Sequence, residues 1–287
     1  MAIDFPISFT KMSGAGNDFI VIDHRVELIP EAEQPGFAKR VCRRMFAVGA
    51  DGLILIENSA VADFRWRFYN GDGSVAEMCG NGARCAARFA YSKGIAGARM
   101  SFETLAGIIE AEICSDDTGD DKTVRLRMTA PCDFRTNLSV ILDGQEKNLS
   151  FVNSGVPHAV LFMEEGENIP VQEWGKIVRF HPLFQPAGTN VNFVQKIGEN
   201  TIRVRTYERG VEDETMACGT GAVASALFAV NYGLASSPVT VITSGGERLT
   251  VLFDLRVGLH GPQVENVFLQ GPARIIYEGK LTAEVLL

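Results

Sequence analysis

The chain has 287 residues, of which 46% are hydrophobic and 22% are charged, and its net charge is −8. This length and composition predict a globular protein of about two domains, and the acidic balance argues against a general nucleic-acid binder. We find no apolar run long enough to span a membrane and no signal-peptide pattern at the N-terminus. The six cysteines lack the spacing of a disulfide scaffold or zinc knuckle, so we expect reduced thiols in a cytoplasmic protein without a metal site.

The first elements predicted along the chain are two strands joined by a loop of small residues. Residues 3–12 alternate between apolar and polar, which predicts a strand, and residues 20–23 predict a second one. The connecting segment 13–19 ends in Asn17-Asp18. Its glycines suit close approach to a ligand, and a simple tight turn is the alternative reading. The segment makes a weak phosphate loop, because no Lys-Ser/Thr follows it and no helix opens from it.

The remaining elements of the first half alternate between helix and strand signals. Residues 36–47 predict a helix with Phe37, Val41 and Met45 on one face and Gly49 after its end. Strands are expected at 53–57, 64–69, 99–114 and 122–130, with a turn at 70–73 and a solvated acidic hairpin tip at 116–121.

A cysteine between a polar loop and a helix is the feature that organises the first half. The segment Ala76–Tyr91 reads Met-Cys-Gly-Asn-Gly-Ala around Cys79 and continues into an alanine-rich run with helical spacing.

The second half repeats this order of elements. A strand from Ser150 ends in a glycine loop before His158, Pro170 starts a helix, and strands are expected at 191–195 and 201–207. Met-Ala-Cys-Gly-Thr-Gly-Ala follows around Cys218, again opening an apolar helical run. Strands are then expected at 239–243, 247–253, 264–269 and 273–278.

The repeated cysteine motif predicts an internal duplication. Cys79 and Cys218 lie 218 − 79 = 139 positions apart, about half the chain. We therefore place a boundary near Pro131, which gives an N-terminal domain 1–130 and a C-terminal domain 131–271. The strand in 272–287 would otherwise lack a partner, so we expect it to return to the first domain. A buried structural cysteine is a common reading of a single motif, but duplicated packing would not need Cys in both copies.

A thiol at a helix N-terminus has chemical consequences. The first amide N–H groups of a helix are unpaired, and that end carries partial positive charge, which together favour a thiolate or a bound carboxylate. Two such thiols facing one another across a cleft between the domains could remove a proton from one face of a carbon and return one to the other. The amides of Gly80-Asn81 and Gly219-Thr220 could stabilise the enolate-like charge that develops. Such chemistry needs no cofactor, and no lysine stands where a pyridoxal Schiff base would be argued.

Nearly the whole chain resembles the diaminopimelate epimerase family. The matching segments are Lys11–Phe19, Asn70–Gly73, Glu77–Cys85, Gly155–His158, Gly188–Phe193, Glu208–Gly210 and Ala217–Gly221. The resemblance implies two similar α+β domains, each with a mixed sheet curled around a central helix. It implies a cytoplasmic, pyridoxal-independent isomerase, often a homodimer, that interconverts LL- and meso-2,6-diaminopimelate on the lysine and peptidoglycan route.

The resemblance also assigns roles to residues. Cys79 and Cys218 correspond to the acid–base pair, and His158 and Glu208 to groups that tune the thiols. The substrate contacts it implies are Asn17, Asn70, Gly80, Asn81, Asn190, Glu208, Arg209, Gly219 and Thr220. The guanidinium fork of Arg209 suits a carboxylate on chemical grounds as well.

Three departures from the family pattern keep other readings open. Many members have Asn where this chain has Val156 and Gln where it has Gly52, and the loop 211–215 is longer here. A related two-cysteine racemase or epimerase of another amino acid is therefore the alternative, although proline-racemase relatives usually carry His where Asn81 stands. A non-catalytic anion-binding module and a redox-sensing dithiol are the readings from other classes.

Overall fold

A computed structural model describes residues 3–114, 123–258 and 261–287. The chain divides into two compact units, Met1–Leu126 with Gly271–Leu287 (unit 1) and Arg127–Gln270 (unit 2). The predicted acidic hairpin tip 116–121 lies outside the described residues. None of the described helices has the length and apolar character needed to cross a bilayer. Assignment of an epimerase domain to each part of the chain stays a prediction.

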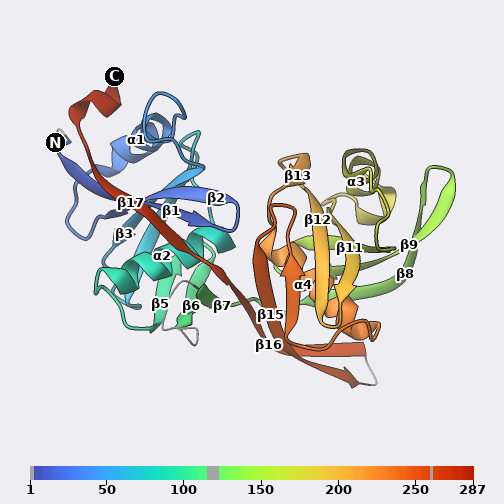
Figure 1. Cartoon of the computed structure of the whole chain (residues 1–287). Helices are drawn as coiled ribbons and strands as arrows, with labels where there is room; N and C mark the ends of the chain where they lie inside the picture. The colour runs from blue at the N-terminus through green and yellow to red at the C-terminus, as the bar shows by residue number, and fades with distance from the viewer. Residues whose placement is uncertain (1–2, 115–122, 259–260) are drawn as a thin grey trace. The chain divides into compact units, whose positions relative to one another are not determined.

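Unit 1 is built on one mixed sheet (Figure 1). Its neighbouring strands are, in order, β17 (Arg274–Leu281), β1 (Ile7–Gly14), β2 (Asn17–Asp23), β3 (Gly52–Glu57), β4 (Phe64–Asn70), β5 (Arg99–Thr104), β6 (Gly107–Cys114) and β7 (Thr123–Arg127). The pairs β2–β3 and β4–β5 are parallel and the others are antiparallel. Parallel neighbours need a crossover, and α1 (Gln34–Val41) and α2 (Gly80–Ser92) supply the two crossovers.

Unit 2 repeats this sheet with the same order of pairings. Its neighbouring strands are β8 (Cys132–Leu142), β9 (Gln145–Asn153), β10 (Pro157–Met163), β11 (Asn190–Gly198), β12 (Thr201–Glu208), β14 (Val239–Ile242), β15 (Arg248–Gly258) and β16 (Gly261–Pro272). The pairs β10–β11 and β12–β14 are parallel, with crossovers through α3 (Val171–Arg179) and α4 (Gly219–Asn231). The short β13 (Asp213–Thr215) pairs with the end of β12.

The pairing pattern shows that the two sheets have one topology. The outer strand of each sheet differs only in its source: β8 directly precedes β9, whereas β17 comes from the end of the chain and pairs with β1 from Ile7–Leu281 to Ser13–Arg274. The predicted fold class, two similar α+β domains from an internal duplication, is confirmed in these terms.

In unit 1 the two helices cover opposite faces of the sheet. Phe37 and Val41 of α1 share a buried core with Leu53 and Leu55 of β3. Successive strand residues point to opposite faces, and Ile54 accordingly contacts α2 at Gly82. Short 3-10 turns at Glu31–Glu33 and Ala283–Leu286 flank this unit.

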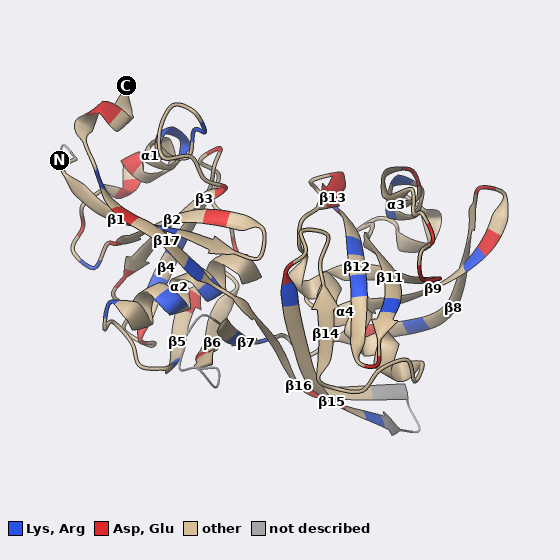
Figure 2. Cartoon of the chain, viewed as in Figure 1, with Lys and Arg blue, Asp and Glu red and all other residues tan. Residues whose placement is uncertain are grey.

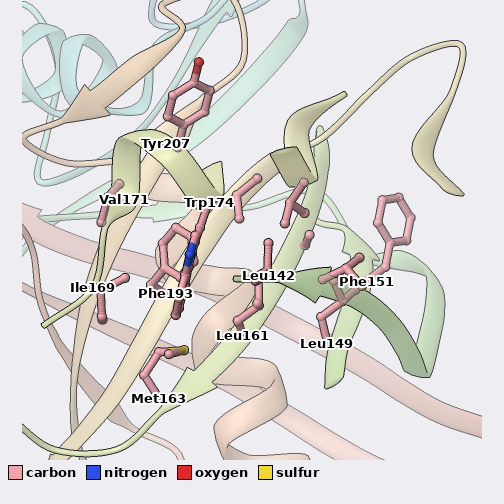
Figure 3. Close-up of a cluster of buried hydrophobic side chains, with 14 of the residues drawn as sticks. Leu142, Leu149, Phe151, Leu161, Met163, Ile169, Val171, Trp174, Phe193 and Tyr207 are labelled. Atoms are coloured by element: carbon pink, nitrogen blue, oxygen red, sulfur yellow. The ribbon is translucent and has the colours of Figure 1, made fainter. Parts of the chain in front are cut away.

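Unit 2 has the same two-sided arrangement. Trp174 and Val178 of α3 pack on Val191 and Phe193 of β11 in a buried cluster (Figure 3). The opposite face of the sheet covers α4, which contacts β9, β10, β11, β12, β14 and β15. A helix held against most strands of one sheet matches the predicted sheet curled around a central helix. A 3-10 turn at Pro182–Phe184 follows α3.

Two local predictions from the sequence were wrong, and the strand β8 was not predicted. The helix expected over 36–47 ends at Val41, and Met45 is fully exposed with a φ of 69°. That left-handed conformation lets the chain turn back, so that the Gly49 N–H donates to Val41 O at 3.0 Å. The strand expected over 99–114 is a hairpin, because Gly107 has a φ of 110°. β8 escaped prediction because its register shifts interrupt the alternation of apolar and polar residues.

Candidate active site

Each predicted thiol stands directly before the first residue of a central helix. Cys79 precedes α2 and Cys218 precedes α4, and both have extended backbones (φ −148° and −120°). The carbonyl of each accepts the first hydrogen bond of its helix, from Ala83 N at 2.8 Å and Ala222 N at 2.9 Å. This is N-cap geometry, which keeps a side chain near the first free amides of a helix. Both side chains are partly exposed.

Other cysteines lie in surroundings that suppress ionisation. Burial raises the pKa of Cys42 and of Cys85 to about 12. A thiol with such a pKa stays protonated near neutrality and is a poor base. Cys85 lies on α2 only two turns from Cys79, so position along one helix separates an inert thiol from a partly exposed one.

A chain of side-chain hydrogen bonds supports the start of α2. The Asn81 amide donates to Asn17 Oδ1 at 2.8 Å and accepts from Arg84 Nη2 at 2.6 Å. Asn17 in turn donates to Asp51 Oδ2 at 2.9 Å. The structure thus brings together two of the predicted substrate contacts in unit 1, Asn17 and Asn81.

The loop that carries Asn17 is a tight hairpin turn. Ala15 and Gly16 have φ values of 52° and 105°, as in a two-residue turn between antiparallel strands. Gly14 lies so close to α2 that an added Cβ would be 2.7 Å from the Asn81 carbonyl oxygen. The segment is therefore a turn, which places Asn17 beside the helix start, and its approach to a ligand stays a prediction.

Asn70 lies at the same edge of the sheet as Asn17 but belongs to a separate hydrogen-bond group. Register pairs Phe19 with Gly52 and Gly52 with Asn70. The Asn70 amide donates to Ser74 Oγ at 3.0 Å within its own turn.

No atom lies within 4 Å of a Cβ built on Gly80, so the first residue of α2 leaves open space.

In unit 2 the buried His158 lies beneath the start of α4. Its Nε2 is 2.9 Å from Thr220 Oγ1, and Thr220 Oγ1 is 3.6 Å from Cys218 Sγ. Burial, with the nearby Arg209 guanidinium as a second cause, lowers the pKa of His158 to about 3. His158 is therefore neutral at physiological pH. It forms no ion pair with Cys218, and the Thr220 hydroxyl lies between the ring and the sulfur.

The end of β12 carries a second polar group. The Arg209 backbone N–H donates to Asn190 Oδ1 at 2.8 Å, and its guanidinium donates to Ala187 O at 3.0 Å. Glu208 accepts a hydrogen bond from Thr215 Oγ1 at 2.9 Å, and burial raises the pKa of its carboxyl. A carboxyl that keeps its proton to higher pH suits proton exchange with a thiol.

Sequence reasoning missed residues that hold these groups in place. Asn192 bonds to His158, and Asp51 and Arg84 anchor Asn17 and Asn81. Asn192 gave a signal in the sequence, because Asn190 and Asn192 alternate with apolar residues at the start of β11. Arg84 gave none, since a fully buried arginine is indistinguishable by sequence from one on a solvated helix face.

Hollows on unit 2 lie around the segment before Cys218. A cavity of about 10 Å³ borders Cys218, Thr206, Thr215 and Thr243. A larger one of about 510 Å³ is lined by Arg203, Arg205, Glu214 and Met216 among others, but by none of the predicted site residues. Figure 2 shows the basic residues of β12 that flank it. Within the described residues, no group of three or more His, Cys, Asp or Glu side chains is placed to hold a metal ion.

Comparison with known proteins assigns the family. The diaminopimelate epimerase family model matches residues 9–131 and 150–256. The chain belongs to the diaminopimelate epimerase family. It is 46% identical to the diaminopimelate epimerase of Aquifex aeolicus, over 98% of this chain and 99% of that one. It is 44% identical to that of Hydrogenobaculum sp., over 96% and 99% of the two chains.

Solved structures more distant than these share the fold of this family member. A phenazine biosynthesis protein of the PhzF family from Bacillus anthracis aligns with a TM-score of 0.70 at 16% identity, over 97% of this chain and 100% of that one. A hydroxyproline epimerase from Agrobacterium vitis aligns with a TM-score of 0.68 at 16% identity, over 99% and 94%. At such identities the likeness concerns the fold alone.

Proposed function

We propose that this protein is a diaminopimelate epimerase that interconverts LL- and meso-2,6-diaminopimelate. One observation carries the proposal. In a chain of this family, each of two topologically equivalent units has one partly exposed cysteine at the N-cap of its central helix. The reaction would serve lysine and peptidoglycan-precursor synthesis in the cytoplasm.

Proton transfer at the α-carbon follows from two thiols of opposite protonation state. The thiolate of one cysteine takes the α-proton, and the C–H electron pair moves into the adjacent carboxylate. The thiol of the other cysteine then donates its proton to the opposite face of the carbon. The α-carbon is inverted, one proton has been taken and one given, and the two sulfurs have exchanged protonation states. The reverse reaction restores them.

Developing negative charge needs fixed donors. We assign this role to the amides of Gly80 and Asn81 on α2 and of Gly219 and Thr220 on α4, since helix N-termini favour anions. The open space at Gly80 supports close approach of a substrate carboxylate. This scheme uses protein groups throughout and needs no pyridoxal phosphate.

Recognition of the two amino-acid ends requires further polar groups. We assign substrate contacts to Asn17, Asn70, Asn190, Glu208 and Arg209. Their existing hydrogen bonds to neighbouring side chains and backbone groups pre-organise them, which lowers the ordering cost of binding. A site whose polar groups fit two amino-acid ends would reject an amino acid that leaves one end unpaired.

His158 and Glu208 are assigned as the groups that tune the thiols. Burial shifts the pKa of each toward its neutral form, and His158, with a pKa lowered to about 3, brings no charge to the substrate. Glu208 can exchange a proton, and neutral His158 can donate or accept a hydrogen bond.

We also propose a homodimer. Consecutive exposed apolar residues Ile275, Ile276 and Tyr277 lie on β17, which among the described strands pairs with β1 alone. An unprotected apolar edge strand favours pairing with another chain. Sedimentation equilibrium should give twice the chain mass for the unaltered protein and a lower mass for Ile276→Lys.

The decisive experiment is conversion of LL-diaminopimelate in deuterium oxide by purified protein without added cofactor. We expect meso product that carries deuterium at the inverted α-carbon, while unconverted substrate gains little label during early turnover. Mass spectrometry after chiral separation measures both. Failure to convert diaminopimelate, together with turnover of a monocarboxylic amino acid, would assign the chain to the alternative racemase. A pyridoxal absorbance that tracks activity would reject the cofactor-free scheme.

A further inference from the structure

Strand register shows which residues occupy equivalent places beneath the two cysteine helices. In unit 1, Phe19 pairs with Gly52, and Ile54 pairs with Phe68. In unit 2 the same steps of the same strands pair His158 with Asn190, and Asn192 with Thr206. Three apolar side chains, Phe19, Ile54 and Phe68, therefore correspond to three polar ones, His158, Asn192 and Thr206.

The apolar set in unit 1 packs as an ordinary core. Phe19 and Phe68 meet edge to face with centroids 5.8 Å apart, and Ile54 and Phe19 contact Gly82 of α2. The fold thus supports an N-cap cysteine above apolar side chains. Burying three polar groups at the same places in unit 2 costs free energy unless each finds its partners, which points to a role beyond folding.

Hydrogen bonds determine the orientation of the Asn192 amide. Its Nδ2 donates to the Ala159 carbonyl at 2.9 Å, and its Oδ1 accepts from Thr206 Oγ1 at 2.9 Å. A carbonyl oxygen only accepts, so the nitrogen must be the atom that faces it. The second hydrogen of that nitrogen faces His158 Nδ1 at 3.0 Å.

The Asn192 orientation determines the tautomer of His158. Because Nδ1 accepts from Asn192, it carries no proton, and the neutral ring carries its proton on Nε2. Nε2 therefore donates to Thr220 Oγ1, 2.9 Å away. With its oxygen accepting that bond, Thr220 has its own proton available for Cys218 Sγ, which lies 3.6 Å from Oγ1.

We propose that Asn192 and His158 are positioning residues that act through the Thr220 hydroxyl to stabilise the thiolate of Cys218, a device that the Cys79 half lacks. The inference rests on the proposed acid–base role of Cys218. Asn192 orients the ring, the ring orients the hydroxyl, and the hydroxyl donates to sulfur. The first two bonds in the series have a fixed direction, and an ionised Cys218 can only accept the third, so the series favours the anion over the thiol.

The second glycine of the Cys218 motif is explained by the same contact. A Cβ on Gly221 would be 2.3 Å from Asn192 Oδ1, whereas one on the equivalent Gly82 would be 3.4 Å from its nearest neighbours. Glycine is thus required where α4 meets Asn192. Burial lowers the pKa of His158 to about 3, which agrees with a ring that stays neutral while it donates a hydrogen bond.

The strands packed against α4 carry several titratable groups. β10 contributes His158, and β12 contributes Glu208, followed by Arg209, whereas β14 has no titratable residue. The others on these strands are Arg203, Arg205 and Tyr207 of β12, Lys196 of β11, Glu146 and Lys147 of β9, and Arg248, Asp254 and Arg256 of β15. Apart from Cys218, the residues that line the small cavity beside it do not titrate.

The first test measures the protonation of Cys218 without substrate. Alkylation by iodoacetamide as a function of pH, with each cysteine peptide quantified by mass spectrometry, gives separate midpoints for Cys218 and Cys79. We expect Thr220→Val to raise the Cys218 midpoint by about one pH unit, as for loss of one hydrogen bond to a charged group. Thr220→Ser should restore it, and the Cys79 midpoint should not move.

Thr243→Val is the matched control. It removes a hydroxyl from the wall of the same small cavity, one that has no hydrogen-bond partner within the described residues, and should leave the Cys218 midpoint unchanged. Equal Cys218 midpoints in Thr220→Val and the unaltered protein would overturn the proposal, as would an equal rise in Thr243→Val.

The second test observes the tautomer directly. The chain has four histidines, so long-range ¹H–¹⁵N correlation spectra of histidine-labelled protein can resolve His158. We expect a proton on Nε2 and none on Nδ1 throughout the neutral range. A proton on Nδ1 would overturn the relay. Because neither test uses diaminopimelate, the relay can fail while the proposed function stands, and the reverse.

Discussion

The two halves of this duplication differ most where they are expected to do the same chemistry. In unit 1 the residue after Cys79-Gly80 is Asn81, whose amide bonds to Asn17 and Arg84. In unit 2 the corresponding residue is Thr220, whose hydroxyl lies between His158 and Cys218. The start of α2 is therefore held by hydrogen bonds among Asn81, Asn17 and Arg84. The start of α4 is held by a hydrogen bond to the buried imidazole of His158.

This difference separates what the fold needs from what the site needs. Both units have the same strand pairings and the same N-cap cysteine, so neither a polar nor an apolar layer beneath the helix is required for folding. An inversion reaction presents each thiol with a different face of the substrate and a different epimer. Unequal surroundings therefore fit the proposed alternation of the two thiols as acid and base.

The largest expected effect comes from removal of either thiol. Cys79→Ala and Cys218→Ala should each lower epimerisation by about 10²–10⁴-fold or more, because acid–base catalysis by a positioned group contributes that range. Each single variant should keep α-proton exchange for the one epimer whose hydrogen faces the remaining thiol. Deuterium exchange of separated epimers measures this, and a Cys79→Ala enzyme with near-normal epimerisation would end the two-thiol scheme.

A second comparison concerns the positive charge of Arg209, which unit 2 has and unit 1 lacks at the equivalent position. Arg209 follows Glu208 at the end of β12, whereas Gly71 follows Asn70 at the equivalent end of β4. Arg209→Lys should lower kcat/KM for diaminopimelate roughly 10–100-fold, since an ammonium cannot copy a bidentate fork. Arg99→Lys, at a side chain 87% exposed, is the control and should match the unaltered enzyme. Near-normal turnover by Arg209→Lys would remove Arg209 from the site.

The paired glycines of the two motifs provide a third comparison. Gly221→Ala brings a methyl group against Asn192 Oδ1, whose amide is held by its hydrogen bonds, and should cost about 1–3 kcal/mol of unfolding free energy. Gly82→Ala meets ordinary contact distances and should be neutral or stabilising by up to about 1 kcal/mol, because Ala favours a helix over Gly by that amount. Denaturant unfolding of both variants measures the contrast. Equal losses of unfolding free energy in the two variants would show that the different residues beneath α2 and α4 do not affect stability.

The last comparison concerns acid sensitivity. Glu57 of β3 pairs with Arg65, and Gln195 of β11 stands at the equivalent place opposite Arg203. Burial opposes ionisation of Glu57, but hydrogen bonds from His24, Arg65 and Arg67 outweigh it and lower its pKa from 4.5 to about 2. A depressed carboxyl pKa gives stability that is complete above 4.5 and is lost as pH falls toward 2.

Glu57→Gln should therefore destabilise unit 1 at neutral pH by roughly 1.5–3 kcal/mol, as for hydrogen bonds to a charged group, and should flatten its response to acid. Hydrogen exchange measured by mass spectrometry follows peptides of β3 and β4, with peptides of β11 and β12 as internal controls. Unit 1 peptides that keep the same acid response in Glu57→Gln would contradict the assignment.

Much of the fold could be predicted from the sequence because its signals are local. Alternation along 201–207 and helical spacing after each cysteine correspond to β12, α2 and α4. Local signals fail where the backbone departs from its regular form. Met45 completes an apolar helical face in sequence but stands in a left-handed turn. The shifts of register in β8 scatter its apolar residues between the two faces.

The sequence alone determined the duplication, the place of each thiol before a helix, and the family, because these depend on residue types at fixed spacings along the chain. Only the tertiary structure decided which side chains lie beneath each helix start. Phe19 and His158 belong to equivalent strands, yet their partners come from residues 33 or more positions away, as the His158–Asn192 and His158–Thr220 bonds show. The direction of each hydrogen bond between Asn192, His158 and Thr220 depends on which atoms of the two side chains face each other. Those positions are determined only when distant strands are brought into register.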